Sequence, residues 1–149
     1  MIAACARSIW AKALFIPKIE LPPCTVDLQP KPNMPTDLQT LTQALRDFAQ
    51  ARDWAQFHSP KNLACALSVE AAELLEHFQW LTEAQSRQLA APKKAEVAAE
   101  AADVLLYLLQ LCDQLKIDLA EAARLKMIVN GDKYPVASAR GSRRKHSGT

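Results

Sequence analysis

Apolar residues recur at every third or fourth position along most of this chain, and this spacing is typical of amphipathic α-helices. The first such stretch predicts a helix over residues 37–51, with its apolar positions at Leu38, Leu41, Leu45 and Phe48. No stretch shows the strict alternation of apolar and polar residues that indicates a half-buried β-strand. The pattern therefore predicts an all-α protein.

Start and stop signals predict three further helices. Ser59 is an N-cap residue followed by proline, and it starts a second helix over about residues 60–80. Another proline opens a third helix, over about residues 92–115. Asp118 caps a fourth helix, which an Asn-Gly pair is expected to end after residue 129. Four helices with short or medium connections predict a four-helix bundle-type fold.

The patterned part of the chain, residues 34–136, is long enough for one domain with its own core. Residues 1–33 hold five of the nine prolines and no sustained period, so an irregular extension is expected there. It has the character of a leader peptide or of an over-extended start before Met34. Residues 137–149 are expected to form a disordered basic tail.

The net charge of +2 combines an acidic central part with basic ends. Residues 34–139 carry ten basic and fourteen acidic side chains. The basic tail is too short to indicate a stable nucleic-acid partner. All three glycines lie after residue 130, which excludes the glycine-rich phosphate loops of P-loop and Rossmann proteins. No apolar run has the length of a membrane span, so no membrane partner is expected.

Four cysteines without CxxC spacing favour reduced thiols over disulfides or a zinc site, and hence a cytoplasmic location. Cys65 and Cys112 lie inside apolar helical patterns and are expected in the core.

The second helix carries acidic residues beside its apolar stripe. On a helical projection this stripe is formed by Leu63, Leu67, Ala71, Leu74 and Phe78. Glu70 lies roughly 60° from the centre of the stripe and Glu73 roughly 120° on the same side, whereas Glu76 lies roughly opposite. Glu76 is therefore expected in solvent, while Glu70 and Glu73 can face the same neighbour.

The third helix repeats this arrangement with Glu100 and Asp103, which are followed by six residues, 104–109, that are apolar around the whole helix. A helix that is apolar on all sides is buried by its partners. Carboxylates that enter such an element face a desolvation cost of several kcal/mol per ion unless a cation or donors compensate. No lysine or arginine lies between residues 62 and 81 or between residues 95 and 114, so an external cation is the expected partner.

The residues alone leave two interpretations open. In the first interpretation the acidic residues form a solvated helix face, as glutamates spaced i, i+3 most often do. Such an acidic face can dock a basic partner, so that the protein is a helical interaction module that catalyses no reaction. The second interpretation is a metal site, for which all-oxygen ligands favour Mg²⁺, with Mn²⁺ as an alternative. A di-iron bundle would need histidine at the fourth place of each pair, and neither pair has it. His77 is expected to be a surface or interface residue.

The joint pattern of Glu70-x-x-Glu73 and Glu100-x-x-Asp103 on two helices resembles the MazG-like all-α nucleoside triphosphate pyrophosphatases. The similarity is to the dCTP pyrophosphatase branch, and it covers about residues 37–136 and neither terminus. It is carried by the stretches "RDWAQFHSPKNLACALSVEAAELLEHFQW", "AADVLLYLLQLC" and "KMIVNGDKYPV".

The resemblance implies that these four carboxylates bind Mg²⁺ and act in catalysis. It also implies hydrolysis of a nucleoside triphosphate between the α and β phosphorus atoms, which releases the monophosphate and pyrophosphate. One carboxylate would orient or deprotonate the attacking water. The same resemblance implies substrate contacts from Trp54, Phe57, His58, Trp80 and Tyr107 at the base, and from Lys126, Asn130 and Tyr134 at the phosphates or sugar.

Without the resemblance, these aromatic residues would be interpreted as core, and Lys126 and Asn130 as the ordinary end of a helix. Two departures from the family pattern bear on the substrate. Ala72 stands where many relatives have glycine, and Leu45 replaces a polar residue that lines the pocket in some of them. The base therefore stays open, with dCTP or modified pyrimidine triphosphates as the expectation. Relatives complete the site across subunits, so a homodimer or homotetramer is expected.

Overall fold

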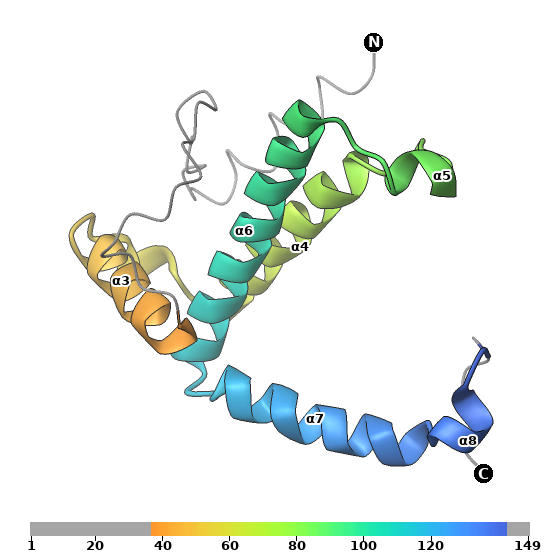
Figure 1. The fold of residues 1–149 in the computed structure, drawn as a ribbon. Helices are drawn as coiled ribbons and strands as arrows, with labels where there is room; N and C mark the ends of the chain where they lie inside the picture. Colours follow the sequence, from red (N-terminus) through yellow and green to blue (C-terminus); the bar gives the residue numbers. More distant parts are fainter. Residues whose placement is uncertain (1–36, 143–149) are drawn as a thin grey trace. The chain divides into compact units, whose positions relative to one another are not determined.

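The computed structural model describes residues 37–142, and within this range the chain is helical and has no strand (Figure 1). The prediction of an all-α fold is confirmed. The helical elements, in chain order, are α3 (Leu38–Gln50), the 3-10 helix η1 (Trp54–Phe57), α4 (Pro60–Glu76), α5 (Glu83–Ser86), α6 (Ala91–Gln114), α7 (Leu119–Lys133) and α8 (Val136–Ala139). None of the described helices is long and apolar enough to cross a membrane.

Three of the long helices, α3, α4 and α7, begin where a side chain accepts from a backbone N–H group of the first turn. The Asp37 carboxylate accepts a hydrogen bond from the Thr40 N–H at 2.8 Å, and the Asp118 carboxylate accepts one from the Glu121 N–H at 2.9 Å. The Ser59 hydroxyl oxygen caps α4 and accepts from the Asn62 N–H at 3.3 Å. The predicted start sites of these helices are confirmed.

Replacing Ser59 by Ala is expected to lower the free energy of unfolding by about 1 kcal/mol, because the first turn of α4 loses its cap. Urea denaturation followed by circular dichroism measures this change. The control is Ser59→Asp, which keeps a capping oxygen and should leave stability within a few tenths of a kcal/mol of the unsubstituted protein. Equal losses from both substitutions would contradict the capping role.

Two predicted helix ends are wrong. Helix α4 ends at Glu76 rather than near residue 80, and the chain continues in turns in which the N–H groups of Phe78 and Gln79 both donate to the Leu75 carbonyl. Helix α7 continues through Gly131, where nothing lies within 4 Å of a Cβ position, and ends at Lys133. The next residue precedes Pro135, and a residue before proline is disfavoured in the helical conformation.

The expected tails are only partly within the described residues. Helix α8 (Val136–Ala139) covers the beginning of the segment expected to be disordered from residue 137. The expected extension over residues 1–33 and the basic residues 143–149 lie outside the described residues.

Contacts divide the chain after Leu115 into two units, and the core lies in the first. There α4 and α6 run antiparallel side by side, and α3 packs against α6 (Figure 1). The core between α4 and α6 consists of Leu63, Ala66 and Tyr107, with Leu67 and Leu111 packed against it. In the second unit, taken by itself, nearly all of α7 is exposed.

The buried face of α4 is rotated from the predicted apolar stripe. Ala71 is exposed, whereas Ala66 and Glu70 are buried. Helix α4 therefore turns Glu70 towards α6, where its carboxylate lies near those of Glu100 and Asp103. Cys112 is buried as expected, but Cys65 is exposed, so its predicted core position is wrong.

Candidate functional site

Three carboxylates from two helices meet at one point. Glu70 on α4 and the pair Glu100 and Asp103 on α6 each offer an oxygen atom, and these atoms all lie within 4.8 Å of one another. Glu100 and Asp103 share a face of α6 because they are one turn apart. Packing of α4 against α6 brings Glu70 to the same point. We call these three residues the carboxylate cluster.

The carboxylate cluster is shielded from water. Glu70 is only 8% exposed, and the other two members are partly buried. The Oε2 atoms of Glu70 and Glu100 are buried and accept no hydrogen bond within the described part of the chain. Burial in the core raises the pKa of the Tyr107 hydroxyl, and the negative charges of Glu70 and Asp103 raise it further. The three carboxylates therefore create a strongly negative electrostatic potential in a region of low dielectric constant.

A divalent cation fits this donor set. Carboxylate oxygens from two packed helices are the hard ligands that Mg²⁺ and Mn²⁺ prefer. Helix α4 has no basic residue after Lys61, and α6 has none after Lys94, so neither helix carries a lysine or arginine at the level of the cluster. A bound cation would offset the repulsion among the three charges and their desolvation cost.

Glu73, the fourth predicted ligand, is not a member of the carboxylate cluster. Its side chain is half-buried on the flank of α4, one turn after Glu70. Glu76 is exposed, as predicted. The structure thus brings together three of the four predicted carboxylates, and the role of Glu73 stays a prediction.

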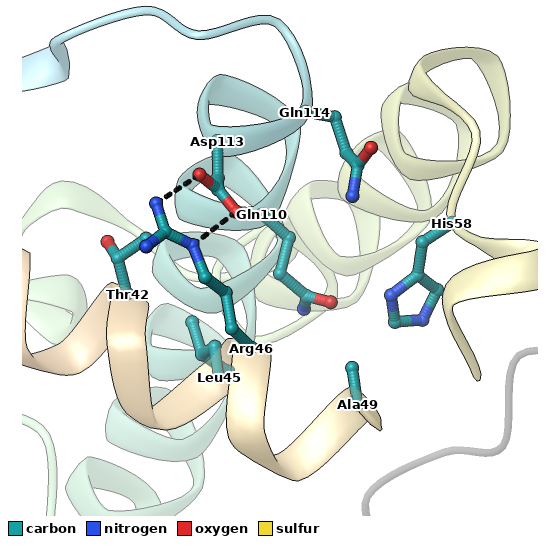
Figure 2. Close-up of a pocket in the computed structure, with 8 residues that line it drawn as sticks. All are labelled: Thr42, Leu45, Arg46, Ala49, His58, Gln110, Asp113 and Gln114. Carbon is teal, nitrogen blue, oxygen red and sulfur yellow. Dashed lines mark hydrogen bonds and ion pairs between the residues drawn. The ribbon is translucent and has the colours of Figure 1, made fainter. Parts of the chain in front are cut away.

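A small polar pocket of about 30 Å³ lies between α3 and α6 (Figure 2). Its lining residues are Thr42, Leu45, Arg46, Ala49, His58, Gln110, Asp113 and Gln114. At its rim the Arg46 guanidinium donates two hydrogen bonds to the Asp113 carboxylate, at 2.8 and 2.5 Å, and so joins α3 to α6. His58 is buried, and this burial lowers the pKa of its imidazole.

The pocket and the carboxylate cluster lie along the same face of α6. Asp103, Tyr107 and Gln110 follow one another at intervals of four and three residues, which keeps them on one side of the helix. Seven residues separate Asp103 from Gln110, about 10 Å along the helix axis. Trp54 lies beside the pocket residue His58, with 6.4 Å between the two ring centroids.

The other predicted substrate residues belong to several elements. Tyr107 is buried in the core between α4 and α6, and Trp80 is 86% exposed just after α4. Phe57 is half-buried at the end of η1. Lys126, Asn130 and Tyr134 belong to the second unit and are exposed on α7 and at its C-cap. Their roles stay predictions.

Sequence reasoning missed two groups of residues near the site. The first is the lining of the pocket, of which only Leu45 and His58 were singled out. The second is the pair of contacts made by His77, which was expected at the surface or at an interface and lies 4.0 Å from Glu100 and 3.7 Å from Glu96. The spacing of Glu96 and Glu100, i and i+4 on α6, was the signal for the second group.

Known proteins are similar to this chain in sequence. The sequence profile of the MazG-like family matches residues 65–148, which include all four predicted carboxylates. The chain is 40% identical over 112 residues to dCTP pyrophosphatase 1 of Mus musculus and, to the same degree, to that of Homo sapiens. Each match covers 74% of this chain and 66% of the relative, so the chain spans about two thirds of the length of these relatives.

The fold has a counterpart among solved structures. A crystal structure of a pyrophosphatase from Archaeoglobus fulgidus superposes with a TM-score of 0.63 at 43% sequence identity. The match covers 70% of this chain and 99% of the archaeal one. From the family profile, these relatives and the shared helical fold, we conclude that this chain belongs to the MazG-like family, in the branch of its dCTP pyrophosphatase relatives.

Proposed function

We propose that the protein is a Mg²⁺-dependent nucleoside triphosphate pyrophosphatase, which hydrolyses its substrate to the monophosphate and pyrophosphate. The observation that carries this proposal is the carboxylate cluster, in a chain that belongs to the MazG-like family. The names of its relatives, which are pyrophosphatases, support the same reaction. Burial of Glu70 argues against an acidic docking face, because a buried carboxylate cannot pair with the surface of a basic partner.

The cluster residues Glu70, Glu100 and Asp103 would hold the metal, with Glu73 as the fourth proposed ligand. Bound Mg²⁺ would neutralise charge on the triphosphate and lower the pKa of a coordinated water. The two helices hold the carboxylates in place before the substrate arrives, so little reorganisation is needed during the reaction. A carboxylate of this set would also orient the attacking water.

We further propose that the pocket between α3 and α6 receives the edge of the base (Figure 2). It lies about 10 Å from Asp103 along α6, a separation that a nucleoside triphosphate bound at the cluster can span. Amide groups of Gln110 and Gln114 offer both donors and acceptors to a base edge. dCTP or a modified pyrimidine triphosphate is the proposed substrate, and removal of such nucleotides from the cellular pool is the proposed role.

The proposal includes a homo-oligomer, either a dimer or a tetramer. Large apolar side chains on α7, among them Met127 at 75% exposure, support an assembly that covers them. Subunit contacts would also bring further residues to the site.

The test is release of pyrophosphate from a panel of ribo- and deoxynucleoside triphosphates, with and without Mg²⁺. We expect turnover only with the metal, and the highest kcat/KM for dCTP or a 5-substituted pyrimidine deoxynucleotide. Folded protein that hydrolyses no member of the panel would overturn the proposal. Activity that survives removal of metal by EDTA would overturn its metal dependence.

A further inference from the structure

His77 stands between two glutamates of α6 at the point where α4 ends. Its Nδ1 atom lies 3.7 Å from Glu96 Oε2, and its Nε2 atom lies 4.0 Å from Glu100 Oε1. The side chain is only 15% exposed, although it follows the last residue of α4. The imidazole is thus held between helices, with one nitrogen towards each carboxylate.

The helix register explains this placement. Glu70 and His77 are seven residues apart and share one face of α4, while Glu96, Glu100 and Asp103 share one face of α6. Helices α4 and α6 run antiparallel (Figure 1). Glu70 therefore meets Asp103 and Glu100, and His77 meets Glu100 and Glu96. Glu100 is therefore shared between the carboxylate cluster and His77.

Two like charges one turn apart on a helix repel each other, and Glu96 and Glu100 are such a pair. His77 lies near both carboxylates and so separates them. Glu96 is held further by Lys93, whose Nζ atom lies 3.0 Å from Glu96 Oε2. A chain of polar contacts thus runs from the exposed lysine through Glu96 and His77 to Glu100.

We infer that His77 is a positioning residue for the metal site, which keeps the Glu100 carboxylate turned into the carboxylate cluster. Groups that contact metal ligands without contacting the metal commonly change metal affinity by about 10- to 100-fold. Both contacts of His77 exceed hydrogen-bond length, so the effect expected here lies at the lower end of that range. This inference rests on the proposed function, because it concerns the same cation.

The test measures Mn²⁺ binding directly, by electron paramagnetic resonance of free Mn²⁺, in addition to turnover. His77→Leu is expected to raise the Kd for Mn²⁺ and the half-saturating Mg²⁺ concentration by about 10-fold. His77→Gln keeps a polar donor and should bind Mn²⁺ within about threefold of the unsubstituted protein. Glu76→Gln is the matched control, because Glu76 is the exposed neighbour of His77, and it should leave the Kd unchanged.

Three results would count against the inference. Unchanged or tighter Mn²⁺ binding by His77→Leu would overturn it, because removal of a neighbouring group would then not disturb Glu100. A fall in melting temperature in EDTA at unchanged Kd would show that His77 only fastens α4 to α6. If the unsubstituted protein binds no Mn²⁺ and turns over no nucleotide, the proposed function fails, and this inference fails with it.

Discussion

Asp103→Asn is expected to reduce kcat/KM for pyrophosphate release by about 10³-fold, equal to about 4 kcal/mol of transition-state stabilisation. Asparagine has nearly the shape of aspartate but removes one of the three charges that meet within 4.8 Å. A divalent cation held by the remaining two carboxylates would neutralise the triphosphate less effectively. Steady-state kinetics at saturating Mg²⁺ measure this loss.

The same substitution is expected to stabilise the protein when no metal is present. Three carboxylates in a shielded site repel one another, and removal of one charge relieves roughly 1–3 kcal/mol of that repulsion. The melting temperature of Asp103→Asn in EDTA should therefore rise by a few degrees, and Mg²⁺ should raise it further by less than in the unsubstituted protein. Opposite signs for activity and stability are typical of residues whose arrangement serves function.

Glu76→Gln provides the matched control, since it removes one exposed carboxylate from α4. It should leave both kcat/KM and the melting temperature nearly unchanged. Full activity of Asp103→Asn would show that the cluster does not hold the catalytic metal. A lower melting temperature in EDTA would show that Asp103 has a structural role instead.

The sequence predicted the helices better where they begin than where they end. Ser59 and Asp118 are short-range signals, because each caps the backbone only three residues ahead. The end of α7 depended on a choice between Gly131 and the residue before Pro135, and helical hydrogen bonds continued through the glycine. Local patterns cannot rank such competing stop signals when both lie within one turn.

The sequence also predicted the kind of site better than it predicted which residues form the site. Spacing alone placed Glu100 and Asp103 on one face of α6, but whether Glu70 or Glu73 turns inward depends on how α4 is rotated against α6. That rotation follows from packing around Leu63 and Tyr107, which connects residues far apart in the chain. The contacts of His77 could not be predicted for the same reason, because its partners Glu96 and Glu100 lie on another helix.

Leu63→Ala is expected to lower the free energy of unfolding by about 3 kcal/mol, within the range of 2–5 kcal/mol seen for buried leucines. Leu63 is 0% exposed and is the largest fully buried side chain of the described residues. It packs with Ala66 and Tyr107 between α4 and α6, so the substitution leaves a cavity in the layer that sets the distance between these helices. Chemical denaturation in EDTA measures the loss.

The control on the same helix is Leu75→Ala, because Leu75 is 60% exposed and should contribute less than about 1 kcal/mol. Equal losses from the two substitutions would contradict the assignment of the core to Leu63. Because the same core layer holds Glu70 opposite Glu100 and Asp103, Leu63→Ala should also weaken Mn²⁺ binding in protein that is still folded. A destabilised protein with unchanged Mn²⁺ affinity would show that the geometry of the carboxylate cluster is set by the cluster's own contacts and not by the core beside it.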